Sequence, residues 1–134
     1  MTPRFRAILR AGIALGAVID ATVCVLALFF QPLLGPLFDI PVRDPALATI
    51  VGGEYVVVTL IYVLLLRDLE RYRGLLYLIA IDQALAALLP AVEIARGHVA
   101  ATFKTIGPIP ISAALAGSYL YAARRLEASR SRSG

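Results

Sequence analysis

The sequence predicts an all-α integral membrane protein, a bundle of four transmembrane helices with both termini in the cytoplasm. Of its 134 residues, 60% are hydrophobic and 16% are charged, and the mean hydropathy of +0.82 is far above that of soluble globular proteins. The apolar residues fall into four stretches of about 20 residues, the length at which a helix crosses a hydrocarbon core about 30 Å thick. We expect helices at about residues 7–30, 46–66, 74–95 and 105–123.

The positions of the Lys and Arg residues indicate the orientation. The N-terminal segment and the connection between the second and third stretches carry three arginines each, and the C-terminal segment carries four. The connections at the opposite end carry only Arg43, Arg96 and Lys104. Because positively charged flanks stay in the cytoplasm, this bias of ten against three predicts cytoplasmic termini. The preference for Arg over Lys is typical of a GC-rich bacterial genome, so we expect the bacterial inner membrane.

The first stretch begins with basic residues, as a signal peptide does. It is too long for one, however, carries Asp20 in its middle, and is not followed by a clear cleavage site. We therefore expect it to remain as the first helix. Gly12, Gly16 and Asp20 recur every four residues and share one face, and glycines at this spacing let another helix approach closely. Asp20 is therefore expected at a helix–helix contact, and Gly12 and Gly16 at packing positions.

The segment 31–45 follows, with four prolines and several large apolar residues. Prolines at this density prevent a continuous helix, and the apolar residues favour a short or irregular segment on the outer membrane surface. A lid over a cavity and an interfacial anchor are both compatible with this composition.

The second and third stretches are joined by the short charged segment 67–73, which predicts two adjacent antiparallel helices. The fourth stretch contains Pro108 and Pro110 near its start, so its helix is expected to begin near Pro108 or to kink there. Residues 128–134 are rich in Ser and Arg and are expected to be a disordered cytoplasmic tail. Residues 1–127 then form a single four-helix domain.

Three lone carboxylates interrupt the apolar stretches: Asp20, Glu54 and Asp82. An aspartate at the centre of a bilayer costs roughly 2.5–3.5 kcal/mol, so such residues face the protein interior, pair with a partner or stay protonated. Counted at about 1.5 Å per residue, all three lie near mid-membrane, as does Ser112 of the fourth stretch. Helical spacing places further hydroxyls on the same stripes, at Tyr62 and Tyr119.

The geometry therefore permits one shared polar centre, turned inward, in which one or two of the acids are neutral. Such a centre relays protons, binds a ligand or a cation, or acts as a general acid or base on a lipophilic substrate. The alternative is purely structural, with the protonated acids, Gln83 and the tyrosines holding helices together. No catalytic motif is present, and we expect no cofactor.

Metal and nucleic acid are not expected as partners. One cysteine, Cys24, and one histidine, His98, are too few for a thiolate or histidine metal site, and no basic face with interleaved aromatics is present. Near the outer end of the third stretch, Glu93 is expected to form a salt-bridged rim with Arg96, His98 and Lys104.

The layout of the chain resembles the small four-helix bacterial inner-membrane families, DoxX-like proteins and related families of unknown function. The resemblance lies in the glycine-containing first helix, the proline-punctuated exit from Gln31 to Pro41, and the tight hairpin from Leu66 to Gly74 with Asp82 eight residues on. It covers most of the chain, contains no specific motif and implies no catalytic residue.

Three classes of function remain open, and an enzyme is the least favoured. The first is a non-enzymatic accessory or assembly subunit of a membrane complex, or a self-associating bundle, that contacts a protein partner through its glycines and alanines. The second is a binder or transporter of a small lipophilic or cationic ligand at the carboxylates. The third is an enzyme acting on an isoprenoid-like or quinone-like lipid.

Overall fold

A computed structural model describes residues 3–39 and 44–130, and all regular secondary structure in these ranges is helical. Four of the helices are long and apolar enough to cross a membrane. In chain order the elements are α1 (Pro3–Phe29), η1 (Gln31–Leu33), α2 (Leu34–Phe38), α3 (Pro45–Arg67), α4 (Leu75–Ala95), α5 (Phe103–Ile106) and α6 (Pro108–Arg130).

The helix ends follow from local sequence. Asp44 caps α3, because its carboxylate accepts hydrogen bonds from the backbone N–H groups of Ala46 and Leu47 at 2.8 and 3.3 Å, and Pro45 occupies the first helical position. Thr102 caps α5 in a capping box with Thr105.

Two helix ends differ from the sequence-based expectation. The first helix begins at Pro3 rather than near residue 7, and α6 continues to Arg130 instead of ending at 123, so the first residues of the expected tail belong to the helix. Residues 131–134 lie outside the described residues. Ala122, Ala123 and Leu126 are buried in the core, and this packing explains why the helix continues past the apolar stretch.

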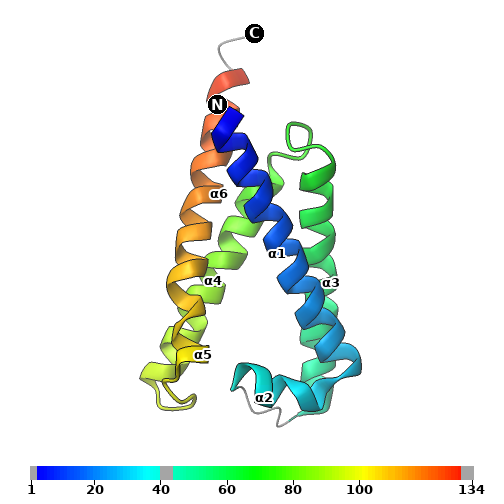
Figure 1. Ribbon diagram of the computed structural model, residues 1–134, viewed down its shortest axis with the longest axis vertical. Helices are drawn as coiled ribbons and strands as arrows, with labels where there is room; N and C mark the ends of the chain where they lie inside the picture. Colours follow the sequence, from blue (N-terminus) through cyan, green and yellow to red (C-terminus); the bar gives the residue numbers. More distant parts are fainter. Residues whose placement is uncertain (1–2, 40–43, 131–134) are drawn as a thin grey trace.

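The long helices form two pairs that join at one end and separate toward the other (Figure 1). The first pair is α1 with α3, and the second is α4 with α6. The antiparallel α3 and α4, which the short connection predicts to be adjacent, touch far less than the members of each pair do. Both termini and the α3–α4 connection lie at the joined end, while α2 and α5 lie at the separated end (Figure 1).

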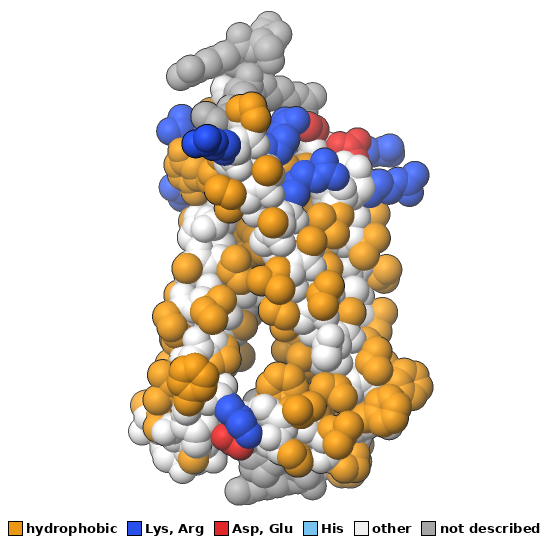
Figure 2. Space-filling view, viewed as in Figure 1, with side chains coloured by type: hydrophobic (Ala, Val, Ile, Leu, Met, Phe, Trp, Pro, Cys, Tyr) orange, Lys and Arg blue, Asp and Glu red, His pale blue; other side chains and the backbone are white. Residues whose placement is uncertain are grey.

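The hydrophobic core occupies the joined end of the molecule. It is built from the first half of α1, the second half of α3, the first half of α4 and the second half of α6. Its largest members are Ile13, Tyr62, Leu65, Leu76, Ile79 and Tyr119. Beyond this core the long helices stay in contact within each pair, whereas the two pairs diverge from one another, which leaves a cleft between them (Figure 2).

The outer faces of the helices carry large apolar side chains, which is the reverse of a water-soluble protein. Arginine side chains gather instead at the joined end (Figure 2). They come from the start of α1, the α3–α4 connection and the end of α6: Arg4, Arg6, Arg10, Arg67, Arg71, Arg73, Arg124 and Arg125.

Candidate functional site

Tyr62 of α3 lies at the point where the two helix pairs meet. Its side chain is fully buried, and its ring lies against the backbone of α1 at Gly16, where a Cβ atom would come within 2.8 Å of the ring carbons Cε1 and Cζ. Toward the other pair, the Tyr62 hydroxyl accepts a hydrogen bond of 3.2 Å from Nε2 of Gln83 on α4. The ring also meets that of Tyr119 on α6 edge to face, with 6.4 Å between centroids.

Asp20 lies one helical turn from Gly16 toward the separated end and is only 5% exposed. Its Oδ2 atom is buried and has no hydrogen-bond partner among the described residues. Burying a carboxylate oxygen without a hydrogen-bond donor costs free energy. This cost is relieved when the oxygen binds a proton or accepts a hydrogen bond from a donor outside the chain. The Asp20 carboxyl lies within electrostatic range of Asp82 on α4 of the other pair.

Asp82 is half-buried, and its Oδ2 accepts a hydrogen bond of 3.3 Å from the Gln83 amide. The Gln83 amide group therefore donates both to Asp82 and to Tyr62 and connects α4 with α3. The structure thus brings together Asp20, Tyr62, Asp82 and Tyr119, one residue from each long helix, with Gln83 between them.

Glu54 does not share this arrangement. It was expected to turn inward, but its side chain is exposed. The buried or half-buried positions of α3 run through Gly52, Tyr55, Thr59 and Tyr62, at the spacing of one helical face, and Glu54 lies about 100° from that face.

Tyr55 was missed by the sequence interpretation. It is half-buried, and its hydroxyl lies within electrostatic range of Asp20, Asp82 and Glu54. The signal was available, because Tyr55 and Tyr62 are seven residues apart and therefore share a helix face. Ser112, in contrast, is half-buried on α6 and forms no hydrogen bond to the acids or tyrosines within the described ranges.

No cation neutralises the two aspartates within the part of the chain that is described. The ion pairs there lie at the two ends of the molecule: Arg6 with Glu70, Arg96 and His98 with Glu93, and Lys104 with Asp39. The expected rim at Glu93 includes Arg96 at 3.3 Å and His98 Nδ1 at 2.8 Å. Lys104 is not part of that rim, because it pairs with Asp39 at 3.4 Å instead.

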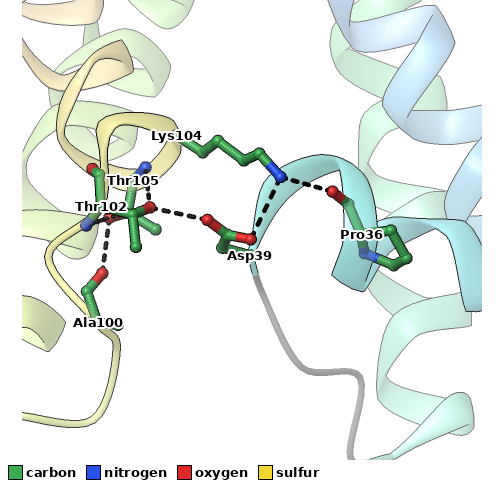
Figure 3. Close-up of polar contacts among 6 residues, drawn as sticks. All are labelled: Pro36, Asp39, Ala100, Thr102, Lys104 and Thr105. Carbon is green, nitrogen blue, oxygen red and sulfur yellow. Dashed lines mark hydrogen bonds and ion pairs between the residues drawn. The ribbon is translucent and has the colours of Figure 1, made fainter.

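The Lys104 contact joins the two helix pairs at their separated end (Figure 3). Lys104 Nζ donates to the Pro36 carbonyl oxygen at 2.7 Å, and Thr102 Oγ1 donates to Asp39 Oδ2 at 2.9 Å. Asp39 ends α2 in the left-handed conformation, with φ of 56°, which turns its carboxylate toward α5. We call Pro36, Asp39, Thr102 and Lys104 the clasp. It bounds the cleft between the pairs at the end opposite the joined core (Figure 2).

Removing the charge of Lys104 is expected to loosen the clasp without unfolding the protein. The ion pair is partly exposed and contributes at most about 1 kcal/mol, so Lys104→Met should raise the ratio of separated to closed α2 and α5 by up to about fivefold. Spin labels at the exposed positions Leu37 and Phe103 would measure this as a broader, longer distance distribution. Lys104→Arg keeps the charge and serves as the control. An unchanged distribution in Lys104→Met would contradict the role of the clasp.

Comparison with known proteins identifies no relative. No family model matches the chain, and neither the curated proteins nor the solved structures include a match. The resemblance to DoxX-like proteins stays a prediction. The site itself consists of two carboxylates and three tyrosines between helix pairs that separate immediately beyond them.

Proposed function

We propose that the protein is an integral protein of the bacterial inner membrane, with both termini in the cytoplasm. Four helices of sufficient length and apolarity support the insertion. The collection of arginines at the joined end, where both termini lie, supports the orientation, because such flanks are retained on the cytoplasmic side. In this orientation the clasp lies at the outer surface and the cleft opens within the membrane.

Within that membrane we propose that the protein binds a small lipophilic molecule in the cleft between its helix pairs. The observation that carries this proposal is the placement of the polar residues at the inner end of the cleft, with Asp20 Oδ2 buried and unpartnered. Most buried polar atoms in native proteins are hydrogen-bonded, so an unpartnered oxygen on a buried carboxylate favours a ligand over helix adhesion alone. Gly12 and Gly16 lie against α6 and α3 of the same chain, so they are occupied by internal packing.

The test is to extract the protein from its native membranes into lipid nanodiscs with an amphipathic polymer and to identify the retained small molecules by mass spectrometry. We expect a lipophilic compound to be enriched over discs from membranes lacking the protein. Asp20→Asn and Asp82→Asn should reduce the bound amount by about tenfold or more, as expected for the loss of hydrogen bonds to a charged group. Glu54→Gln, at an exposed position, is the matched control and should retain the compound.

Circular dichroism and gel filtration of each variant separate lost binding from lost folding. Absence of any enriched compound in the wild-type protein would contradict the proposal. Equal losses in Asp20→Asn and Glu54→Gln would place the ligand elsewhere.

A second candidate is an accessory subunit that packs against a larger membrane partner. It is favoured by Ala113 and Gly117 of α6, which are four residues apart and exposed, with open space around the Gly117 Cα. Small residues at this spacing let a partner helix approach closely. The same nanodisc preparation tests this function, because a larger complex should accompany the protein and Gly117→Leu should release it. Purification of the protein alone would argue against it.

A further inference from the structure

We propose that the ligand of this site is a protonated organic amine with an apolar body, and that its ammonium group binds between Asp20 and Asp82. The inference rests on the proposed ligand-binding function and specifies the chemical class of the ligand. Its starting point is Asp20 Oδ2, an acceptor on a side chain more than nine-tenths buried that receives no hydrogen bond from the described residues. An ammonium N–H supplies the missing donor.

The charge of the site favours a cation over a neutral donor. Asp20 and Asp82 lie within electrostatic range of one another, and the groups around them, Gln83 and the tyrosine hydroxyls, are uncharged. The described residues that carry positive charge pair with other acids at the two ends of the molecule or lie on the arginine-rich end. A bound ammonium group would therefore supply a positive charge that the protein does not place near this pair.

The surroundings favour an organic cation over a metal ion. In the described part of the chain no three His, Cys, Asp or Glu side chains come together in a way that could hold a metal. The site has three tyrosines instead, Tyr55, Tyr62 and Tyr119, on two helices. Tyr62 and Tyr119 are covered by protein contacts, so only the half-buried Tyr55 has ring surface left to stabilise an ammonium group by cation–π attraction.

The cleft favours an apolar body on the amine. It lies between helix pairs whose side chains are mostly apolar, and it is bounded by the joined core at one end and by the clasp at the other (Figure 2). A charged headgroup held by the aspartates leaves the remainder of the ligand in this apolar space. A fully hydrated inorganic ion gains nothing from such walls, whereas an amphiphilic amine buries its apolar surface there.

The experiment compares three probes that share one skeleton: 4-phenylbutylamine, 4-phenylbutanol and 4-phenylbutyrate. Binding to the full-length protein in nanodiscs is measured by equilibrium dialysis at neutral pH, with empty nanodiscs subtracted. We expect the amine to bind about tenfold to hundredfold more tightly than the alcohol, and the carboxylate to bind most weakly, the difference expected for a hydrogen bond to a charged group. Asp20→Asn should remove the preference for the amine and leave the affinity for the alcohol unchanged.

The outcomes distinguish the amine proposal from the broader proposal that the cleft binds a lipophilic ligand. Equal binding of amine and alcohol to the wild-type protein would overturn the amine proposal and leave a lipophilic-ligand site in place. No binding of any probe above empty nanodiscs would count against the proposed function as well. Asp82→Asn, at a half-buried position, gives the same comparison should Asp20→Asn fail to fold. Glu54→Gln should behave as the wild type, and an equal loss of amine binding there would overturn the assignment to Asp20 and Asp82.

Discussion

Gly16→Ala is expected to destabilise the protein by about 1–3 kcal/mol, the usual cost of overfilling a packed site. The new Cβ would lie 2.8 Å from Cε1 and Cζ of Tyr62, closer than real Cβ contacts allow. The Tyr62 ring cannot withdraw easily, because it is fully buried and already contacts Gln83 and Tyr119. Helices α1 and α3 would therefore have to move apart at this contact. Titration with a denaturing detergent, followed by circular dichroism, measures the change.

Gly53→Ala is the matched control for this substitution. Gly53 lies inside α3, is exposed and has no atom within 4 Å of the position that a Cβ would take. Alanine should be neutral there or stabilise the helix by up to about 1 kcal/mol through helix propensity. Gly12→Ala, with its nearest atoms at 3.8 Å, should fall between the two. Equal shifts for Gly16→Ala and Gly53→Ala would show that α1 and α3 do not meet as described.

Tyr62→Ala is expected to have the largest effect of any single substitution considered, a loss of about 3–5 kcal/mol in the free energy of unfolding. The side chain is completely buried and contacts elements of both helix pairs, so its removal leaves a cavity at their junction. Beyond the lost stability, we expect the pairs to move apart, because α3 and α4 have few other contacts. Spin labels on the outer faces of α3 and α4 would detect a longer distance.

Tyr62→Phe separates packing from hydrogen bonding in the same position. It keeps the ring and removes only the acceptor for Gln83, so the expected cost is about 1 kcal/mol. Val63→Ala, at the exposed neighbouring position, should cost less still. A cost for Tyr62→Ala no greater than that for Val63→Ala would mean that Tyr62 does not join the pairs.

The packing at Gly16 and Tyr62 also limits which substitutions can test the ligand site. Gly16 and Tyr62 hold the helices in place, and the acids lie directly beyond them toward the cleft. Substitutions that disturb the junction would abolish binding indirectly. The conservative changes Asp20→Asn and Asp82→Asn preserve side-chain size, and for that reason they report on charge and hydrogen bonding at the site.

Much of the fold follows from the sequence alone. Four apolar stretches of membrane length predict four long helices, since within a bilayer the backbone must satisfy its hydrogen bonds inside one segment. The burial of Asp20 follows from its spacing with Gly12 and Gly16, because two glycines on one face allow close helix approach. The proline-rich segment after α1 predicts the short helices η1 and α2, and residues 40–43 of that segment lie outside the described residues.

The partners of these helices were decided only by the tertiary structure. A hydropathy pattern gives each helix its length but not its neighbour, and the short α3–α4 connection suggested a pairing that the packing replaces with α1–α3 and α4–α6. A difference of one residue, about 100° around a helix, places Tyr55 at the site and Glu54 on the surface. Asp39 and Lys104, 65 residues apart, meet only because α2 and α5 lie at the same end of the molecule. Hydropathy along the chain thus determined which residues form long helices, whereas the faces that meet, and with them the exposure of Glu54, depend on close packing between side chains far apart in the chain.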